Sequence, residues 1–282
     1  MSQKNTHAFV LGPGGFLGQI ILAEAGARYT PLRISQVQDE NDLMRFEREV
    51  ENALKHDPQA AIVNCIGRRE ASLDLMKVLN VGIPEILVKV TKRFEARLIH
   101  FGSAAETTHS VQKASEGIHP APAATLTYGT TKRAGTDVCL TYEKATVLRV
   151  YNLHGLPHQS SSGLHQLCRS VRIALDRGTQ PSLIDTTRDY VHWQAVLNAL
   201  NNALDFNSNG LIEVCSGFGI AMSEIIEGLP LDVRTQVAEQ LKPPDYFAPV
   251  IGPHPTLGED ATNKSNVVRA LSDEVTTCAS SE

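Results

Sequence analysis

The stretch HAFVLGPGGFLG, residues 7–18, decides the fold. A short apolar run ends at Gly12 and helical apolar spacing begins at Phe16, so the sequence predicts a strand, a tight turn and a helix in succession. Gly12, Gly15 and Gly18 stand in the order GxxGxxG. Glycine permits a tight turn and a close approach of backbone to a pyrophosphate, whose charge a helix N-terminus favours. We therefore predict a nucleotide-binding turn, with an ordinary glycine-rich turn as the alternative.

Strand and helix patterns alternate outward from this turn. Strand-like runs are expected at residues 7–12, 29–34, 60–67, 96–103, 145–152 and 210–216, and helical spacing at 16–26, 42–55, 73–94, 127–142, 193–204 and near 266–271. This alternation predicts an α/β protein with a Rossmann-type doubly wound parallel sheet, which binds ligands at the carboxyl ends of its strands. We expect the nucleotide-binding domain to comprise residues 1–152 with 186–216, and a small C-terminal substrate lobe to comprise 153–185 with 217–282.

The bulk properties exclude several classes of protein. The 282 residues carry a formal net charge of -5 with no basic stripe, which argues against nucleic acid as a partner. No apolar stretch is long enough to span a bilayer, and residues 1–7 lack the pattern of a signal peptide. The 5 cysteines lie far apart and form no CxxC pair, so neither a disulfide framework nor a metal site is expected. We therefore expect a cytoplasmic protein.

Arg33 bears on the choice of cofactor. An acidic residue at the end of the second strand would hydrogen-bond the adenosine ribose of NAD, but this strand ends in Leu32-Arg33-Ile34. A carboxylate would repel a 2′-phosphate, whereas a guanidinium can pair with it. We therefore predict that the cofactor is NADP, with NAD as the alternative. Arg33 could also be a solvated surface arginine without a binding role.

Tyr128, Lys132 and Ser103 are the candidate catalytic residues. Tyr128 and Lys132 lie four residues apart on a predicted helix, hence on one face. An ammonium and a positive nicotinamide ring both favour the phenolate, so Tyr128 can exchange a proton with an alcohol oxygen. Ser103 ends the predicted strand ARLIHFGS, which places its hydroxyl at the carboxyl edge of the sheet. The spacing YxxxK is common by chance, and Ser103 is what makes the pair persuasive.

These residues and several ordered segments resemble the extended short-chain dehydrogenase/reductase family, which includes nucleotide-sugar epimerases, dehydratases and reductases. Besides the glycine turn and the Ser103, Tyr128 and Lys132 set, the similar segments are NVGIP at 80–84, RVYNLHG at 149–155, RDYVH at 188–192 and ATNK at 261–264. The resemblance covers nearly the whole chain in order. It implies the same fold and an NAD(P)-dependent enzyme.

The resemblance also implies roles for individual residues. Ser103 would hydrogen-bond the reacting oxygen and Lys132 would hold the nicotinamide ribose. The substrate's diphosphate would be contacted by Asn152 and paired with Arg188. The residues expected at the cofactor are Gly12, Gly15, Phe16, Leu17, Gly18, Arg33, Asn64, Gly67, Asn80 and Lys132. A homodimer formed through the two helices beside the active site would be usual for the family.

The expected reaction follows from what stands after Ser103. Dehydratases of the family carry an acidic pair there, whereas this chain has Ala104 and Ala105, with Glu106 displaced by one position. Because NADP-linked members are more often reductases, we expect a reductase of a nucleotide-linked keto-deoxysugar, with hydride from NADPH and a proton from Tyr128. His165 resembles a substrate-side acid of some members, although a packing role is the alternative.

Two other functions stay open at this point. One is a nucleotide-sugar epimerase with bound NAD(P), and the other is a catalytically silent NADP-binding regulator. The chain departs from the family at Trp193-Gln194, where an acidic residue is usual, and at His154, where a tyrosine is usual. Against a silent regulator stands the intact set of Ser103, Tyr128 and Lys132.

Overall fold

The computed structural model describes residues 6–24, 26–69, 71–107, 123–155, 164, 168, 171–172, 183–238, 241–242 and 263–280. The chain divides into two compact units. The first comprises Met1–Ser115, Pro120–Arg149 and Leu197–Ile212, and the second Glu116–His119, Val150–Val196 and Glu213–Glu282.

A six-stranded sheet organises the first unit in the described part of the chain. Its strands are β1 (Ala8–Leu11), β2 (Tyr29–Leu32), β3 (Ala61–Asn64), β4 (Leu98–Ser103), β5 (Ala145–Val150) and β10 (Gly210–Val214). They lie in the order β2-β1-β3-β4-β5-β10. Strand β1 pairs in parallel with β2 and β3, and β3 pairs in parallel with β4. The chain moves from β1 to one side and then returns past it to β3, so the strand order reverses direction beside β1.

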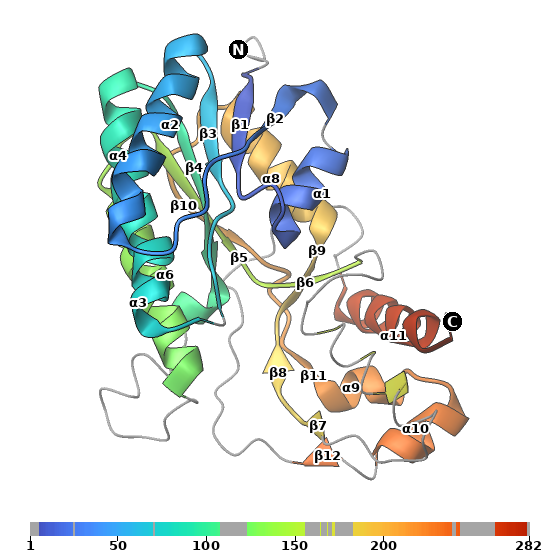
Figure 1. Cartoon of the computed structure of the whole chain (residues 1–282). Helices are drawn as coiled ribbons and strands as arrows, with labels where there is room; N and C mark the ends of the chain where they lie inside the picture. The colour runs from blue at the N-terminus through green and yellow to red at the C-terminus, as the bar shows by residue number, and fades with distance from the viewer. Residues whose placement is uncertain are drawn as a thin grey trace. The chain divides into compact units, whose positions relative to one another are not determined.

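Helices cover both faces of this sheet, as Figure 1 shows. Helices α2, α4 and α6 lie on one face, and α1 and α8 lie on the other. Their bounds, with the short α3 that precedes α4, are α1 (Phe16–Glu24), α2 (Leu43–His56), α3 (Leu73–Lys77), α4 (Ile83–Phe94), α6 (Ala123–Leu140) and α8 (Trp193–Asp205). All four residues of β3 are buried, as the apolar run there predicts for a strand covered on both faces. The prediction of a Rossmann-type doubly wound parallel sheet is confirmed.

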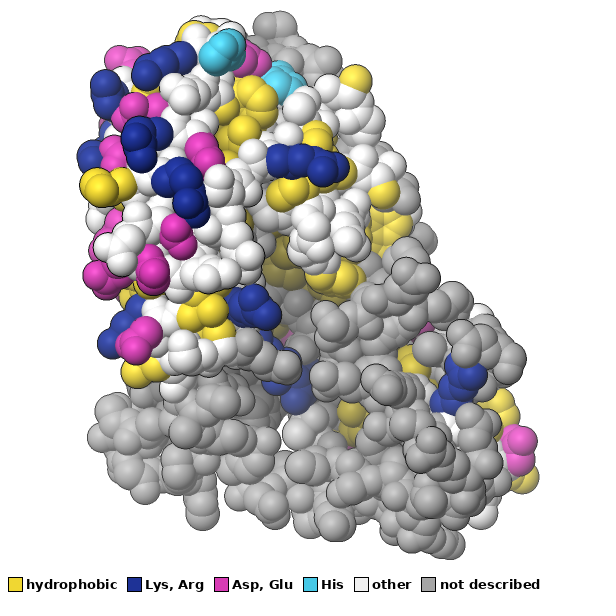
Figure 2. Space-filling model, viewed as in Figure 1, with side chains coloured by type: hydrophobic (Ala, Val, Ile, Leu, Met, Phe, Trp, Pro, Cys, Tyr) yellow, Lys and Arg dark blue, Asp and Glu magenta, His cyan; other side chains and the backbone are white. Residues whose placement is uncertain are grey.

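Helix α2 shows how sequence sets this layering. Phe46, Val50 and Leu54 recur at helical spacing and are buried, so one stripe of the helix packs into the core. The outer faces of α2 and α4 carry acidic and basic side chains in alternation, which Figure 2 shows as mixed magenta and dark blue. Lys89 pairs with Glu47 at 2.7 Å across the two helices. The described residues on this face therefore form no patch of a single charge.

The second unit has its own core. Its strand pairs are β6 (Asn152–His154) with β9 (Tyr190–His192), β7 (Leu183–Ile184) with β12 (Leu241–Lys242), and β8 (Thr187–Arg188) with β11 (Ile220–Ala221). Its helices are α9 (Met222–Glu227), α10 (Leu231–Ala238) and α11 (Lys264–Ser280). Buried side chains from β9, α9 and α11, among them Tyr190, Ile225 and Leu271, form one hydrophobic cluster. Helix α11 is longer than the short helix predicted near 266–271.

No helix among the described residues combines the length and the apolar character that crossing a membrane requires.

His154 is a buried titratable group of the second unit. It ends β6 opposite His192 of β9, and the two ring centroids are 5.1 Å apart. The Glu274 carboxylate of α11 lies 3.9 Å from His154 Nδ1. Burial, with a smaller effect from the charge of His192, lowers the pKa of His154 to about 4. The imidazole is therefore neutral in the folded protein at neutral pH.

We predict that His154 makes the fold acid-sensitive. A histidine in the unfolded chain has a pKa near 6.5, whereas the pKa of His154 in the folded protein is about 4. Between these pH values the unfolded chain binds a proton at His154 and the folded chain does not, so acid favours unfolding. Urea unfolding should show stability that is full above pH 6.5 and falls by roughly 3 kcal/mol towards pH 4. H154Q should flatten this dependence, whereas H56Q, at an exposed histidine, should not. Equal pH dependence in the wild type and H154Q would contradict the prediction.

Candidate active site

The glycine turn joins β1 to α1. Gly12 has a φ of +74°, and a Cβ there would lie 3.2 Å from the backbone of Cys65 and Ile66. Gly15 N–H donates to Gly12 O at 3.0 Å, which closes the turn. A Cβ on Gly18 would lie 2.2 Å from Gly12 O. The turn therefore needs glycine at residue 12 for its conformation and at residue 18 for helix packing.

The turn lies where the sheet order reverses, at the carboxyl ends of β1 and β3. Phe16 and Leu17 form the first residues of α1, beside the turn. Leu11 pairs with Leu32 of β2, so Arg33 follows at the same edge of the sheet. Arg33 is exposed, and its guanidinium makes no ion pair within the described residues. Doubly wound folds bind their ligands at this position, outside the carboxyl ends of the strands where the strand order reverses.

Ser103 and Tyr128 meet at the same edge. Ser103 is the last residue of β4, and Tyr128 lies in the second turn of α6. The Ser103 hydroxyl lies near enough to the Tyr128 phenol to lower its pKa by hydrogen bonding. The approach is close because a Cβ on Gly129 would lie 2.3 Å from Ala105 O, so only glycine lets α6 pack on the turn after Ser103. The structure therefore brings this predicted pair together.

The Tyr128 phenol is protonated at neutral pH. Burial raises its pKa above the usual 10, the hydrogen bond with Ser103 lowers it, and the Glu106 charge raises it. The cation that lowers it is that of Arg69 in the exposed loop after β3. A phenol that keeps its proton is suited to donating it.

Lys132 lies one helical turn from Tyr128 and is buried, with 3% of its surface exposed. Its Nζ donates to Phe101 O at 2.6 Å and lies 3.4 Å from His100 Nε2. Burial lowers the pKa of Lys132, and the Glu106 charge opposes that shift. Burial, with a further contribution from Lys132, holds the pKa of His100 well below its usual range. The ammonium is thus anchored to β4 at the edge where Tyr128 lies.

Gly67 and Asn80 lie beside Lys132. A Cβ on Gly67 would be 3.5 Å from Lys132 Nζ and 3.4 Å from Asn80 Oδ1. Asn80 stands in the π-helical turn Val78–Gly82 and is buried. Its Nδ2 donates to Thr131 Oγ1 at 3.0 Å, and its Oδ1 accepts from Arg68 N at 3.1 Å. Asn80 therefore ties the loop after β3 to α6.

Asn64 is buried at the end of β3. Its Oδ1 accepts from Ile66 N at 3.0 Å, and its Nδ2 lies 3.0 Å from His100 Nδ1. Because Oδ1 is an acceptor, Nδ2 donates to the ring, and the neutral ring carries its proton on Nε2. The amide of Asn64 therefore orients His100, which lies next to Lys132.

Glu106 has a structural role that its place in the sequence does not indicate. Its carboxylate is buried, accepts from Ser103 N at 2.7 Å and pairs with Arg149 Nε at 3.1 Å. The sequence shows Glu106 only as an acid displaced from the dehydratase position. The Arg149 partner lies 43 residues away, so local spacing gives no signal for the pair. The carboxylate thus fixes the backbone at Ser103.

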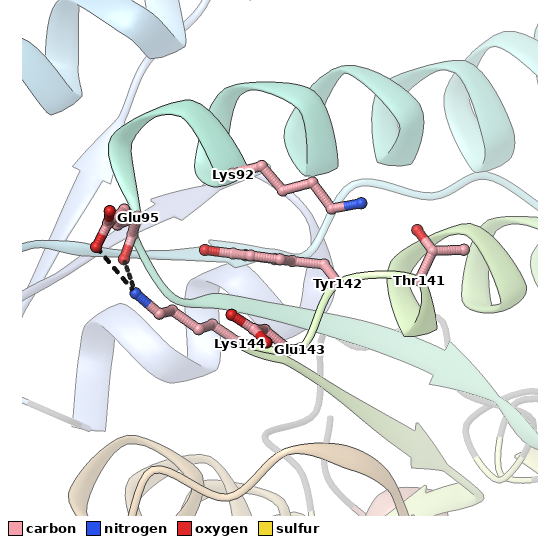
Figure 3. A pocket seen from close by; sticks show the side chains of 6 residues that line it. All are labelled: Lys92, Glu95, Thr141, Tyr142, Glu143 and Lys144. Carbon is pink, nitrogen blue, oxygen red and sulfur yellow. Dashed lines mark hydrogen bonds and ion pairs between the residues drawn. The ribbon is translucent and has the colours of Figure 1, made fainter.

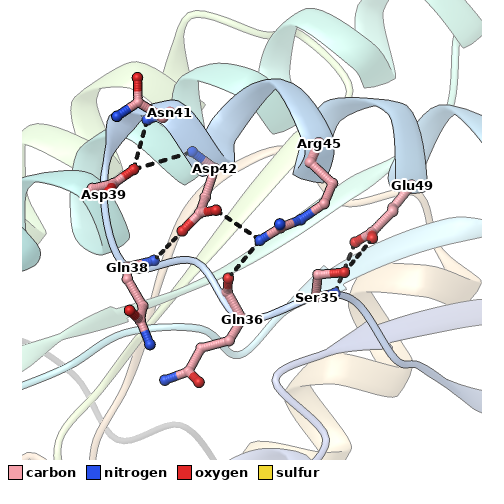
Figure 4. A network of polar contacts seen from close by, with 8 residues as sticks. All are labelled: Ser35, Gln36, Gln38, Asp39, Asn41, Asp42, Arg45 and Glu49. Atoms are coloured by element: carbon pink, nitrogen blue, oxygen red, sulfur yellow. Dashed lines mark hydrogen bonds and ion pairs between the residues drawn. The ribbon is translucent and has the colours of Figure 1, made fainter.

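The segment after β2 is held against the start of α2. Arg45 donates to Gln36 O at 3.0 Å and pairs with Asp42 at 2.7 Å. Ser35 donates through both its N–H and its hydroxyl to Glu49, at 2.8 and 2.6 Å. Figure 4 shows these side chains facing the segment from α2. The segment that Arg33 begins therefore has a defined conformation.

Asn152 and Arg188 belong to the second unit. Arg188 Nη1 lies 3.5 Å from Asn152 Oδ1, and Asn152 Nδ2 donates to Asp189 O at 2.9 Å. The structure brings these two predicted substrate residues together. His165 lies outside the described residues. Within the described residues there is no group of three or more His, Cys, Asp or Glu side chains able to hold a metal ion.

A pocket of about 430 Å³ lies elsewhere in the first unit. Figure 3 shows the side chains that line it, which come from the end of α4 and from the residues between α6 and β5. These residues precede β4 and β5, so the pocket lies at the amino edge of the sheet. Tyr142 turns its hydroxyl to Ala96 O at 2.8 Å. The candidate catalytic residues do not line this pocket.

The sequence matches the profile of the NAD dependent epimerase/dehydratase family over residues 8–214. A search of the curated proteins found no relative.

Several solved structures share this fold. The WbmG enzyme of Bordetella bronchiseptica, in complex with NAD and UDP, aligns with a TM-score of 0.65 and 18% identity over 88% of this chain and 87% of its own. RMD from Pseudomonas aeruginosa, complexed with NADPH, aligns with a TM-score of 0.64 and 21% identity over 98% of this chain and 99% of its own. The dTDP-4-dehydrorhamnose reductase of Bacillus anthracis, in complex with NADP, aligns with a TM-score of 0.65 and 14% identity over 90% of this chain and 91% of its own. At these identities the likeness shows a common fold.

We predict that the glycine turn tolerates a methyl group at one position and rejects it at another. G18A should lower the free energy of unfolding by about 1–3 kcal/mol, because the added Cβ meets Gly12 O. G14A is the matched control in the same turn, since nothing lies within 4 Å of its added Cβ. Urea unfolding compares the two variants, and equal stability would contradict the packing argument.

The buried pair of Glu106 and Arg149 gives a second prediction. R149M should lower the free energy of unfolding by about 3–5 kcal/mol, because it removes the cation that pairs with the buried Glu106 carboxylate and leaves that charge uncompensated. R45M, which breaks the exposed pair with Asp42, should cost less than about 1 kcal/mol. The double variant E106Q/R149M should recover part of the loss. Similar losses from R149M and R45M would be the contrary result.

Proposed function

Since the chain belongs to the NAD dependent epimerase/dehydratase family, we propose that it is an NADPH-dependent reductase of a keto group on a nucleotide-linked deoxysugar. The observation that carries this proposal is that Ser103, at the end of β4, and a protonated Tyr128 of α6 lie together at the carboxyl edge of the sheet. A reductase needs a proton donor beside the carbonyl oxygen, and this pair supplies one.

The residues at this edge fit a nicotinamide dinucleotide. A side chain at Gly12 would crowd the backbone just after β3, one at Gly18 would meet the Gly12 carbonyl, and one at Gly67 would approach Lys132. Glycine at these positions allows the close backbone approach that a dinucleotide-binding turn requires. Arg33, which makes no ion pair within the described residues, offers a cation just after β2, where a 2′-phosphate is held in NADP-binding members of this fold. The bound cofactor would supply the hydride.

The chain's own residues supply the proton. Tyr128 O–H donates to the keto oxygen as that oxygen gains negative charge, and Ser103 holds the same oxygen by a hydrogen bond. Lys132, one turn along α6, binds a ribose hydroxyl in place of its contact with Phe101 O. Its positive charge also favours the phenolate that remains after the proton has left.

The contacts of Glu106 favour reduction over dehydration. Dehydration needs an acid that protonates and expels a sugar hydroxyl. The Glu106 carboxylate is buried and occupied by Ser103 N and by Arg149, so it is not available as that acid.

The substrate class rests on the family and on the neighbours' ligands. The similar structures include a complex with UDP and an enzyme named for dTDP-4-dehydrorhamnose. In this chain Asn152 and Arg188 are our candidates for binding the diphosphate, because a planar guanidinium suits two phosphate oxygens.

Turnover tests the proposal. Purified protein with NADPH and pooled nucleotide keto-sugars should consume NADPH, followed at 340 nm. Y128F should lower kcat by about 10²–10⁴-fold and leave the dissociation constant for NADPH unchanged. Y142F is the matched control, since the Tyr142 hydroxyl donates to Ala96 O at the other edge of the sheet.

Unchanged turnover in Y128F would end the proposal. A new sugar epimer without net NADPH consumption would replace it with an epimerase, and tight NADPH binding with neither outcome would replace it with a regulator.

A further inference from the structure

Ser35 presents two hydrogen-bond donors to a single carboxylate. Its N–H donates to Glu49 Oε2 at 2.8 Å and its hydroxyl to Glu49 Oε1 at 2.6 Å. Phosphate groups are held in proteins by this kind of donor pair, a backbone N–H and a hydroxyl, usually with an arginine nearby. Arg33 stands two residues before Ser35 and has no partner among the described residues. Glu49 therefore occupies donors that also suit a phosphate.

The position of Ser35 relates it to the adenosine end of the cofactor. Strand β2 ends at Leu32, whose partner Leu11 immediately precedes the glycine turn. The residues that follow β2 meet the adenosine ribose in doubly wound folds. Ser35 and Arg33 thus lie in the segment where a 2′-phosphate would be bound.

The segment keeps its shape independently of Glu49. Arg45 donates to Gln36 O at 3.0 Å, and Gln38 N–H donates to Asp42 at 2.9 Å. The side chain of Val37 is buried between these contacts. The Ser35 donors would therefore stay in place if the Glu49 side chain turned away (Figure 4).

We infer that Glu49 is a cofactor-specificity residue that competes with the 2′-phosphate of NADPH for Ser35. This inference rests on the proposed cofactor site. The phosphate takes the N–H and hydroxyl of Ser35 together with the Arg33 guanidinium, and the Glu49 side chain turns towards solvent. A carboxylate so close to the phosphate repels it, so Glu49 weakens NADPH binding and leaves NADH, which has no 2′-phosphate, unaffected.

Nucleotide fragments test this without turnover. Calorimetry gives the dissociation constants of 2′,5′-ADP and of 5′-AMP, which differ only in the 2′-phosphate. E49Q should tighten binding of 2′,5′-ADP by about tenfold, as removal of one nearby like charge predicts. Binding of 5′-AMP should change by less than about twofold. E49A should show the same selective gain if E49Q folds poorly.

Glu47 provides the matched control. It lies on the same helix two residues away and pairs with Lys89 at 2.7 Å, so E47Q makes the same change of charge away from Ser35. E47Q should leave both affinities within about twofold of the wild type. Equal effects of E49Q and E47Q, or equal gains for both nucleotides, would overturn the inference.

Failure of the proposed cofactor is a separate result. A wild type that binds 5′-AMP more tightly than 2′,5′-ADP would contradict the assignment of NADPH. A selective gain for 2′,5′-ADP in E49Q would still support the role of Glu49 in that case.

Discussion

Close backbone contact at three glycines is the constraint on which the proposed site depends. Gly18 packs α1 on the carbonyl of Gly12, and Gly129 and Gly135 pack α6 on the carbonyls of Ala105 and Asn80. A Cβ at any of the three would lie 2.0–2.3 Å from a carbonyl oxygen. Because the backbones approach this closely, the start of α1 faces the crevice and α6 presents Tyr128 to Ser103.

Buried polar contacts then orient the side chains that these packings bring together. Glu106 bonds to Ser103 N and to Arg149, and the Lys132 ammonium bonds to Phe101 O. Burying charges costs free energy, and in this protein the two buried groups hold the backbone at Ser103 and the ammonium beside β4. The same contacts determine which side chain of the site can donate a proton. The carboxylate that could act as an acid is occupied, and Tyr128 keeps its proton.

Sequence alone predicts most of the fold because local signals set it. The apolar run at β3 and the glycine turn predict buried strands and a nucleotide crevice. Helix α11 is longer than the sequence predicts. Ser272 and Thr276 interrupt its apolar pattern, which suggests an earlier end, but their hydroxyls donate to carbonyls four residues back and the helix continues. The contacts of Glu106 with Arg149 and of Glu49 with Ser35 were not predictable, since they depend on partners that the fold brings close. A single sequence gives no signal for such contacts.

In the proposed reaction Tyr128 protonates a keto oxygen while hydride reaches the substrate from NADPH. Transfer of deuterium tests it most directly. NADPH carrying deuterium at the transferred position of its nicotinamide is incubated with the protein and nucleotide keto-sugars, and the sugars are examined by mass spectrometry. We expect one deuterium on the reduced carbon of a nucleotide sugar with the wild type and none with Y128F. A reduced or epimerised sugar without deuterium, or no modified sugar at all, would contradict it.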